Sequence, residues 1–437
     1  MLALVLAAVC AGALALFSAQ RFDGSPGSER GFVLKTYIDP QGEEHQYLVF
    51  VPYDYKRGQK RPLLLFLNGM GENGTDGVSP IKDFWMQVGE MKRSFPFVVA
   101  IPQCRPGPGW TARERDKALG FLDQVAADYD TDPDRVYVTG LSSGGTGVWN
   151  LVASHPGRFA AAVPLCGHPA GSAEAPAQAA PAQVQIWNFY NEKDAPDLVE
   201  SNRRMRQELL EAGGSPLVTE YPLSGHACWG LAYRCTGMYD WLLEQSRSHN
   251  ARQTRPFELL AADRILSTWQ SHGPARWTAE DARTIACRNA AADQPGYVIS
   301  RAAYAACEFH VDVYLESASQ ECQLGLFEQA TDEPLSGYVL HVSLPDAGSG
   351  GLAHSTDGWI AALDPAAQRQ LRTAYWNDVR LHFGPGRITA RINGWKALDV
   401  HPASHATHPV HVALGAARAR SAVRWRNLRV RELDHGP

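Results

Sequence analysis

The chain has 437 residues, which is too long for one compact core, so its length predicts about two or three domains. A composition of 45% hydrophobic and 20% charged residues is that of a soluble globular protein. The formal net charge of −5 gives no support to a nucleic-acid partner, because phosphate-binding surfaces need clustered lysine and arginine.

An uncharged stretch begins the chain. Residues 1–17 carry no charged side chain, and Arg21 is the first charged residue after them. This pattern is typical of the apolar part of a secretory signal or a short membrane anchor. We therefore expect residues 1–20 to be a signal peptide or N-terminal anchor, with Ala19 as the best cleavage position. The protein is then exported, to the periplasm or the medium, and meets a membrane only through this segment; a buried helix is the alternative.

Residues 32–244 alternate short apolar runs with helical patterns. Nearly all-apolar strands that alternate with helices predict a mostly parallel sheet covered by helices on both faces. This region is therefore expected to be one α/β domain. The expected strands are 46–53, 62–69, 96–103, 135–140, 159–167 and 184–191, and the expected helices are 115–129, 146–155 and 198–214.

The pattern changes after residue 244. Residues 245–256 are polar and are expected to be a linker. From 257 to 434, short alternating runs separated by glycine-containing turns predict an all-β domain, an antiparallel sandwich. In its last strand, Arg424, Arg426 and Arg429 alternate along the chain, and we expect them on a solvated face.

A glycine- and serine-rich segment joins an expected strand to an expected helix. The sequence Gly140-Leu141-Ser142-Ser143-Gly144 fits the G-x-S-x-G nucleophile elbow in this context. A sharp strand-to-helix turn crowds the positions two before and two after its apex, where a Cβ would clash. Ser142 is then the candidate nucleophile. The backbone N–H of Ser143, at the helix N-terminus, is a candidate oxyanion donor.

Three other segments supply the partners that such a serine needs. Asn68-Gly69-Met70-Gly71 follows an apolar strand, and the Met70 N–H is the second candidate oxyanion donor. Asp194 follows a later strand, and His226 lies on a glycine-flanked loop after that. The order Ser142, Asp194, His226 is the chain order of α/β-hydrolases. Asp197 is a rival for the acid, and we favour Asp194 because it is nearer the strand end.

These residue types predict acyl transfer without a cofactor or a metal ion. A serine hydroxyl is a weak nucleophile at neutral pH, so a base must take its proton. His226 can take that proton and return it to the leaving group. Asp194 would hold the imidazole tautomer and stabilise its charged form.

The first domain resembles a known family in these motifs. Gly140–Gly145 reads G-L-S-x-G-G, Tyr221–His226 reads Y-P-x-x-G-H, and Trp229 follows the histidine. In these motifs the region 32–244 is similar to the bacterial feruloyl and acetylxylan esterases and polyhydroxyalkanoate depolymerases, a branch of the α/β-hydrolases. One departure is Asn68, which stands where that branch usually has histidine.

The resemblance implies a secreted serine carboxylic-ester hydrolase. The implied partner is an esterified polysaccharide or oligosaccharide, deacylated at feruloyl or acetyl groups, with Trp229 as a substrate-binding residue. Two alternatives stay open. One is a serine peptidase of the prolyl-oligopeptidase-like group, and the other is a non-catalytic carbohydrate-binding or adhesion protein.

The second domain resembles, in residues 375–400 and 423–433, the concanavalin-like domain of 3-keto-disaccharide hydrolases. Where that family has an acid after a Gly-Tyr pair, this chain has Val339. The resemblance therefore implies a sugar-binding or packing module rather than a glycosidase. Trp359 and Trp395, both beside glycine, are the candidates for stacking on sugar.

Seven cysteines follow the N-terminal stretch, so at least one is unpaired within the chain. We expect Cys104 and Cys166 to be packed core thiols. Cys228, two residues after His226, is a candidate for a bridge to Cys235 or elsewhere, and the sequence leaves the connectivity open.

Overall fold

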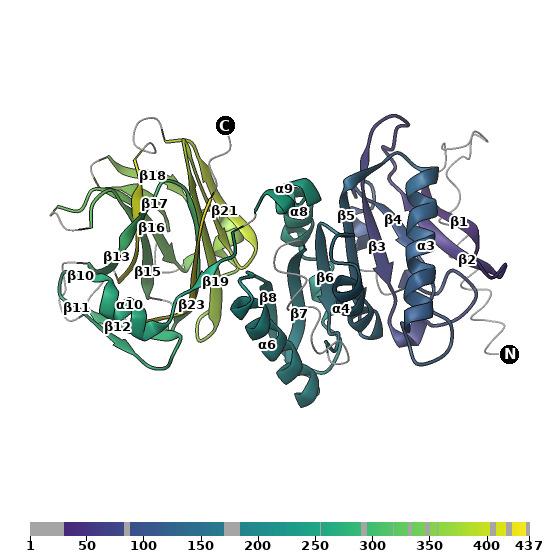
Figure 1. Cartoon of the computed structure of the whole chain (residues 1–437), viewed down its shortest axis with the longest axis horizontal. Coiled ribbons are helices and arrows are strands. Elements are labelled where there is room, and N and C mark those ends of the chain that lie inside the picture. The colour runs from purple at the N-terminus through teal and green to yellow at the C-terminus, as the bar shows by residue number, and fades with distance from the viewer. Residues whose placement is uncertain are drawn as a thin grey trace. The chain divides into compact units, whose positions relative to one another are not determined.

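The computed structural model (Figure 1) describes residues 30–82, 88–169, 184–253, 255–289, 295–317, 319–330, 334–345, 350–355, 357–402, 408–416 and 422–433. The chain divides into two compact units. One unit consists of Met1–Leu209 and Thr219–Arg252, and the other consists of Leu210–Val218 and Gln253–Pro437.

The first unit is built on an eight-stranded sheet with the order β1-β2-β4-β3-β5-β6-β7-β8. The central pairs β3–β4, β3–β5, β5–β6 and β6–β7 are parallel, whereas β1–β2 and β2–β4 are antiparallel. The bounds are β1 Gly31–Ile38, β2 Glu44–Val51, β3 Arg61–Leu67, β4 Val98–Ile101, β5 Thr131–Leu141, β6 Ala161–Leu165, β7 Gln185–Lys193 and β8 Leu217–Ser224.

Helices cover both faces of this sheet, which confirms the predicted α/β-hydrolase fold. Apolar side chains of α3 (Ala112–Asp128), α4 (Ser143–Ser154) and α6 (Pro196–Glu211) share one buried cluster with alternate residues of the central strands. On the other face, Tyr239 and Trp241 of α8 (Thr236–Glu244) make edge contacts with Phe95 and Trp187. The strands are apolar throughout because each face is buried against helices.

Shorter helices complete the described part of the first unit. They are η1 (Met70–Glu72), η2 (Gly89–Met91), α7 (Trp229–Ala232) and α9 (Arg247–Arg252). Helix α9 lies within residues 245–256, which the sequence predicts as a linker.

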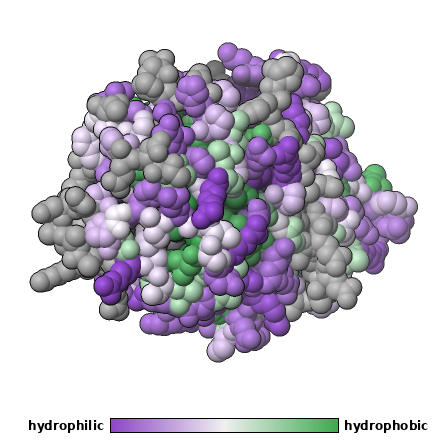
Figure 2. All heavy atoms as spheres, turned by 60° about the vertical axis from the view of Figure 1, so that its left-hand side comes forward, coloured by the Kyte–Doolittle hydropathy of each residue, from purple (hydrophilic) through white to green (hydrophobic). Residues whose placement is uncertain are grey.

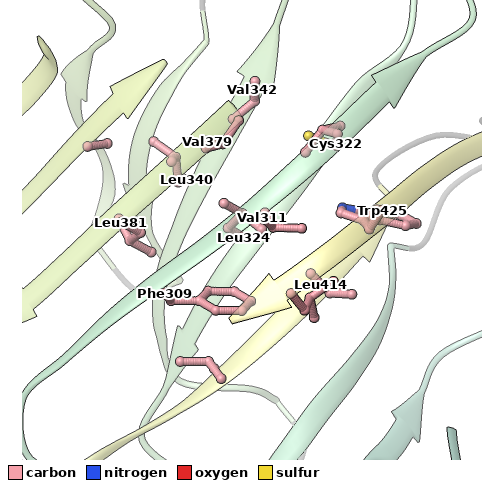
Figure 3. Close-up of a cluster of buried hydrophobic side chains, with 14 of the residues drawn as sticks. Phe309, Val311, Cys322, Leu324, Leu340, Val342, Val379, Leu381, Leu414 and Trp425 are labelled. Atoms are coloured by element: carbon pink, nitrogen blue, oxygen red, sulfur yellow. The ribbon is translucent and has the colours of Figure 1, made fainter. Parts of the chain in front are cut away.

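The second unit contains two antiparallel sheets, as predicted for a sandwich. One has seven strands in the order β10-β13-β22-β15-β16-β17-β18, and the other has eight in the order β11-β12-β23-β14-β19-β20-β21. Inward-facing side chains from both sheets, among them Phe309, Val311, Leu324, Leu340 and Leu414, form one buried cluster (Figure 3). Alternation along each strand brings these apolar residues to the same side.

The elements of this unit are β9 Glu258–Leu259, α10 Ala262–Thr268, β10 Gln270–His272, β11 Ala275–Ala279, β12 Thr284–Asn289, β13 Gly296–Tyr304, β14 Cys307–Leu315, β15 Glu321–Phe327, β16 Gly337–Ser343, β17 Gly351–His354, β18 Gly358–Ala362, α11 Pro365–Gln368, β19 Trp376–Gly384, β20 Arg387–Ile392, β21 Trp395–Val400, β22 Val410–Ala416 and β23 Ala422–Glu432.

The expected solvated arginine face of β23 is wrong at Arg429. This side chain is fully buried, with Nη2 3.0 Å from Oδ2 of Asp378 and Nη1 3.6 Å from Oδ1 of Asp312. The adjacent strand β14 supplies Asp312, and the strand beyond it, β19, supplies Asp378. The two carboxylates compensate a charge that could not otherwise be buried. Arg424 and Arg426 keep about a third of their side chains exposed, at 34% and 32%.

The predicted signal peptide or anchor, residues 1–20, lies outside the described residues. In the described part of the chain, none of the helices combines the length and the apolar character that a membrane crossing requires.

Candidate active site

Ser142 occupies a strained turn between β5 and α4. Its backbone has φ 54° and ψ −118°, a conformation that is rare for a residue with a side chain. A Cβ on Gly140 would lie 2.7 Å from the carbonyl oxygen of Gly144. A Cβ on Gly144 would fall on the Leu67 carbonyl and 2.7 Å from that of Asn68. The two glycines flanking the apex are therefore required by crowding, as the motif predicts.

We expect Gly144→Ala to lower the free energy of unfolding by about 3 kcal/mol, because the added methyl group meets rigid backbone oxygens rather than a movable side chain. Gly71→Ala is the matched control, since a Cβ there has no atom within 4 Å. It should shift the same value by no more than about 0.5 kcal/mol. Urea titration followed by tryptophan fluorescence measures both, and equal effects at the two positions would refute the steric explanation.

The structure brings three of the predicted site residues into one hydrogen-bonded row. His226 Nε2 lies 2.9 Å from Ser142 Oγ, and His226 Nδ1 lies 2.8 Å from Asp194 Oδ2. With a neutral imidazole, the serine hydroxyl donates to Nε2 and Nδ1–H donates to the carboxylate. The side chain of His226 is 42% exposed, whereas that of Asp194 is 5% exposed. The base is therefore open to solvent, and its carboxylate partner is enclosed.

The rival acid Asp197 is placed elsewhere. It lies at the start of α6, and its carboxylate is 3.5 Å from Nε2 of His168 with 77% of its side chain exposed. Asp194 is fixed from a second side, since its Oδ1 accepts a hydrogen bond of 2.7 Å from the Ala195 N–H. Of the two carboxylates, only Asp194 contacts His226 among the described residues.

Backbone contacts hold the loops of Asp194 and His226 together. The Gly225 N–H donates to the Lys193 carbonyl at 3.1 Å, and the Asn191 side-chain amide donates to the Gly225 carbonyl at 2.8 Å. The two loops are thus bonded to each other at Lys193 and Gly225, the residues directly before Asp194 and His226.

The two candidate oxyanion donors lie at the same edge of the sheet. Met70 begins η1 just beyond β3, and Ser143 begins α4 just beyond β5. These strands are parallel neighbours with Leu67 opposite Gly140. Neither the Met70 N–H nor the Ser143 N–H donates to another described residue. The role of these two N–H groups as oxyanion donors stays a prediction.

Asn68, which replaces the usual histidine, supports the loop that carries Met70. Its buried side chain accepts a hydrogen bond from the Cys104 N–H at 3.0 Å and donates to Asn73 Oδ1 at 3.0 Å. The Trp110 indole N–H donates to the Asn68 carbonyl at 2.9 Å. The asparagine thus ties the ends of β3 and β4 together, a role that its residue type alone does not reveal.

Trp229, the predicted substrate-binding residue, is half-buried at the start of α7. Its ring centroid is 5.8 Å from that of His226, in an edge-on orientation with an interplanar angle of 79°. It therefore packs edge-on beside the imidazole.

The cysteine expectations are partly wrong. Cys166 is not a lone core thiol, because it forms a disulfide with Cys228, 62 residues further on, so the partner of Cys228 is not Cys235. Cys166 directly follows β6, and Cys228 follows His226, so both lie at the edge of the sheet that carries the site. Cys104 is a buried free thiol, as expected, and burial raises its pKa to about 12.

We expect the double variant Cys166→Ser/Cys228→Ser to lose about 4 kcal/mol of unfolding free energy, because the bridge closes a loop of 62 residues in the unfolded chain. The loop of His226 would also lose its tether, so kcat should fall. Urea titration with and without dithiothreitol measures the first effect. Dithiothreitol should lower the urea midpoint of the wild type to that of the double variant. A wild-type midpoint that dithiothreitol leaves unchanged would contradict this.

Two groups of possible metal ligands occur in the described residues. The first consists of Cys166, Asp194 and His226, but its sulfur is bound in the disulfide and its other members bind each other. The second consists of Asp39, Glu43 and His45, where His45 Nε2 lies 3.0 Å from Asp39 Oδ2. The donors of both groups are therefore already committed to contacts within the protein.

A mostly parallel sheet with a serine at a sharp strand-to-helix turn defines an α/β-hydrolase. Residues 41–301, more than half of the chain, match the sequence model of the family described as "Putative esterase". The chain belongs to this esterase family. Residues 257–431 match the model described as a 3-keto-alpha-glucoside-1,2-lyase-like domain. Both resemblances predicted from the sequence are thus confirmed.

Individual relatives match shorter parts of the chain. Poly(3-hydroxyalkanoate) depolymerase C of Paucimonas lemoignei is 33% identical over 99 residues, 20% of this chain and 23% of that protein. The crystal structure of a thermostable esterase is 32% identical with a TM-score of 0.43, covering 49% of this chain and 63% of its own. The structure of a ferulic acid esterase is 19% identical with a TM-score of 0.37, covering 48% and 96%. The chain thus spans about a quarter of the depolymerase and less than two thirds of the thermostable esterase.

Proposed function

We propose that the protein hydrolyses carboxylic esters with Ser142, His226 and Asp194 as a catalytic triad. The observation that carries this proposal is the hydrogen-bonded row in which His226 joins the serine hydroxyl at 2.9 Å to the carboxylate at 2.8 Å. Membership of the esterase family supports esters as the substrate class.

The mechanism follows from this arrangement. Ser142 Oγ attacks the ester carbonyl carbon while its proton passes to His226 Nε2. The carbonyl oxygen gains the negative charge and accepts hydrogen bonds from the N–H groups of Met70 and Ser143. His226 then returns the proton to the departing alkoxide, the C–O bond breaks, and an acyl-enzyme remains. Asp194 stabilises the imidazolium in between. Water repeats the sequence and releases the acid.

The finer proposal is that the alcohol part of the substrate is a carbohydrate bearing acetyl or feruloyl groups. It is supported by the match of residues 257–431 to a domain model whose description names a glucoside lyase. Trp229, beside His226, is the proposed contact for the group next to the ester. We further propose that the protein is exported, on the basis of the uncharged residues 1–17.

A paired panel of substrates tests the function. The purified chain should cleave p-nitrophenyl acetate but leave the matched anilide, p-nitroacetanilide, uncleaved. Among natural substrates, acetylated and feruloylated xylo-oligosaccharides should be cleaved faster than tributyrin. Amide cleavage at a comparable rate would point to a peptidase instead, and tributyrin as the best substrate would reject the carbohydrate ester.

A further inference from the structure

One exposed tryptophan lies on the outer face of the seven-stranded sheet. Trp359, on the edge strand β18, is 59% exposed, and no other described tryptophan is exposed. Trp395, the other candidate from the sequence, is half-buried and packs against the core. A single exposed apolar side chain is common on protein surfaces, so the surroundings of Trp359 decide its significance.

The indole of Trp359 is held against the sheet rather than free in solvent. A Cβ on Gly351, on the adjacent strand β17, would lie 2.9 Å from Cζ3 of the indole. Glycine at this position therefore lets the ring lie over the strand. The ring of His341, on β16, is 4.9 Å from that of Trp359. The indole thus lies over strand β17 and beside the ring of His341, while more than half of the Trp359 side chain stays accessible.

A fixed set of polar groups continues from the indole across the sheet. Cross-strand pairing places Gln323 opposite His341, and His341 opposite Gly351, so that these residues share one face. Oε1 of Glu321 lies 2.6 Å from His341 Nδ1 and 3.2 Å from Gln323 Nε2. The hydroxyl of Tyr297 in turn donates to Gln323 Oε1 at 2.6 Å. Each polar group is thereby held in one orientation before any ligand arrives.

This network leaves one nitrogen of the His341 ring for a ligand. In the neutral imidazole whose Nδ1–H donates to Glu321, the other ring nitrogen, Nε2, is an acceptor, and it has no hydrogen bond to another described residue. The side chains of His341 and Glu321 are 20% and 14% exposed. In the space-filling view, hydrophilic residues predominate on the visible face and hydrophobic ones show between them near its centre (Figure 2).

A sugar ring is the ligand that matches this combination. One side of a pyranose or furanose presents C–H bonds, which pack on an indole face, and its rim presents hydroxyl donors, which suit carboxylate and imidazole acceptors. The carboxylate of Glu321 disfavours a phosphate or an acidic glycan through like-charge repulsion. We propose that Trp359, His341 and Glu321 form a binding site for a neutral sugar ring of a glycan. That this glycan is the carbohydrate part of the ester substrate rests on the proposed function.

Affinity gel electrophoresis tests the site in the full-length chain, carrying Ser142→Ala so that the polymer is not hydrolysed. Native gels containing xylan, arabinoxylan, hydroxyethyl cellulose or levan are compared with a gel without polysaccharide. At least one of these neutral polymers should retard the protein. Trp359→Ala should weaken the apparent affinity about tenfold or more, and Glu321→Gln should weaken it as well.

Ile360→Ala is the matched control, because Ile360 is the next residue of the same strand, is 38% exposed and is not one of the three proposed site residues. It should bind like the parent. Retardation by none of the polymers, retardation by acidic polymers only, or equal retardation of Trp359→Ala would overturn the site. With Ser142 intact, Trp359→Ala should cleave p-nitrophenyl acetate at the wild-type rate. Failure of the esterase proposal is then seen in that assay alone, and failure of the sugar site is seen only in the gels.

Discussion

Ser142→Ala is expected to lower kcat for p-nitrophenyl acetate by about 10⁵–10⁶-fold, to the level left by the oxyanion donors and substrate binding alone. The alanine keeps the backbone of the turn but has no hydroxyl for His226 to deprotonate. Labelling by a fluorophosphonate probe should also disappear, because the probe forms its covalent bond with the activated serine oxygen.

The neighbouring serine provides the matched comparison. Ser143 Oγ is buried and has no hydrogen-bond partner among the described residues, so Ser143→Ala removes no hydrogen bond and keeps the backbone N–H proposed as an oxyanion donor. It should retain fluorophosphonate labelling and lose less than about tenfold in kcat. Circular dichroism and thermal unfolding verify that both variants are folded. Full labelling of a folded Ser142→Ala protein would remove Ser142 from the mechanism.

These two adjacent serines show which features of the site can be predicted from the local sequence. The glycines at positions 140 and 144 mark the elbow because the clashes that exclude a Cβ involve backbone oxygens of the turn itself and of the parallel strand beside it. Backbone crowding of this kind is a property of the motif, so the sequence alone identifies which serine is at the apex. The strands of the parallel sheet are equally predictable, because burial on both faces makes them apolar throughout.

Features that depend on distant pairings could not be predicted in this way. The partner of Cys228 is Cys166, because the ends of β6 and β8 meet at one sheet edge, and no spacing rule in the sequence encodes that meeting. The burial of Arg429 likewise depends on Asp378, which β19 brings to it across β14. From the sequence, an arginine in an alternating strand is predicted to be solvated. Its burial can be predicted only once the strands beside it, and the carboxylates that they carry, are known.

The choice between Asp194 and Asp197 also depends on contacts that the sequence does not reveal. Both follow β7 within a few residues, so sequence position gives only a preference for the one nearer the strand. The hydrogen bonds distinguish them, because Oδ1 of Asp194 accepts a hydrogen bond from the Ala195 N–H and its Oδ2 faces His226. That geometry makes the acid the most discriminating position at which to test the proposed triad.

Asp194→Asn is expected to lower kcat by about 10⁴-fold, whereas Asp197→Asn should leave it within about twofold of the wild type. The Ala195 N–H requires an acceptor, so the carboxamide oxygen will occupy the place of Oδ1. The amide NH₂ then faces His226 and donates to Nδ1. This places the ring proton on Nε2, where it points at Ser142 and prevents the imidazole from accepting the serine proton.

Kinetics on p-nitrophenyl acetate separate this tautomer effect from a general loss of structure. Because the substituted group does not touch the substrate, KM should change little while kcat falls. Asp197, with 77% of its side chain exposed and only His168 within ion-pair distance among the described residues, offers the same chemical change without access to the base. A loss of kcat at position 197 with none at 194 would transfer the role of the acid to Asp197. Equal losses at both would show that negative charge near the sheet edge, rather than control of the imidazole tautomer, supports catalysis.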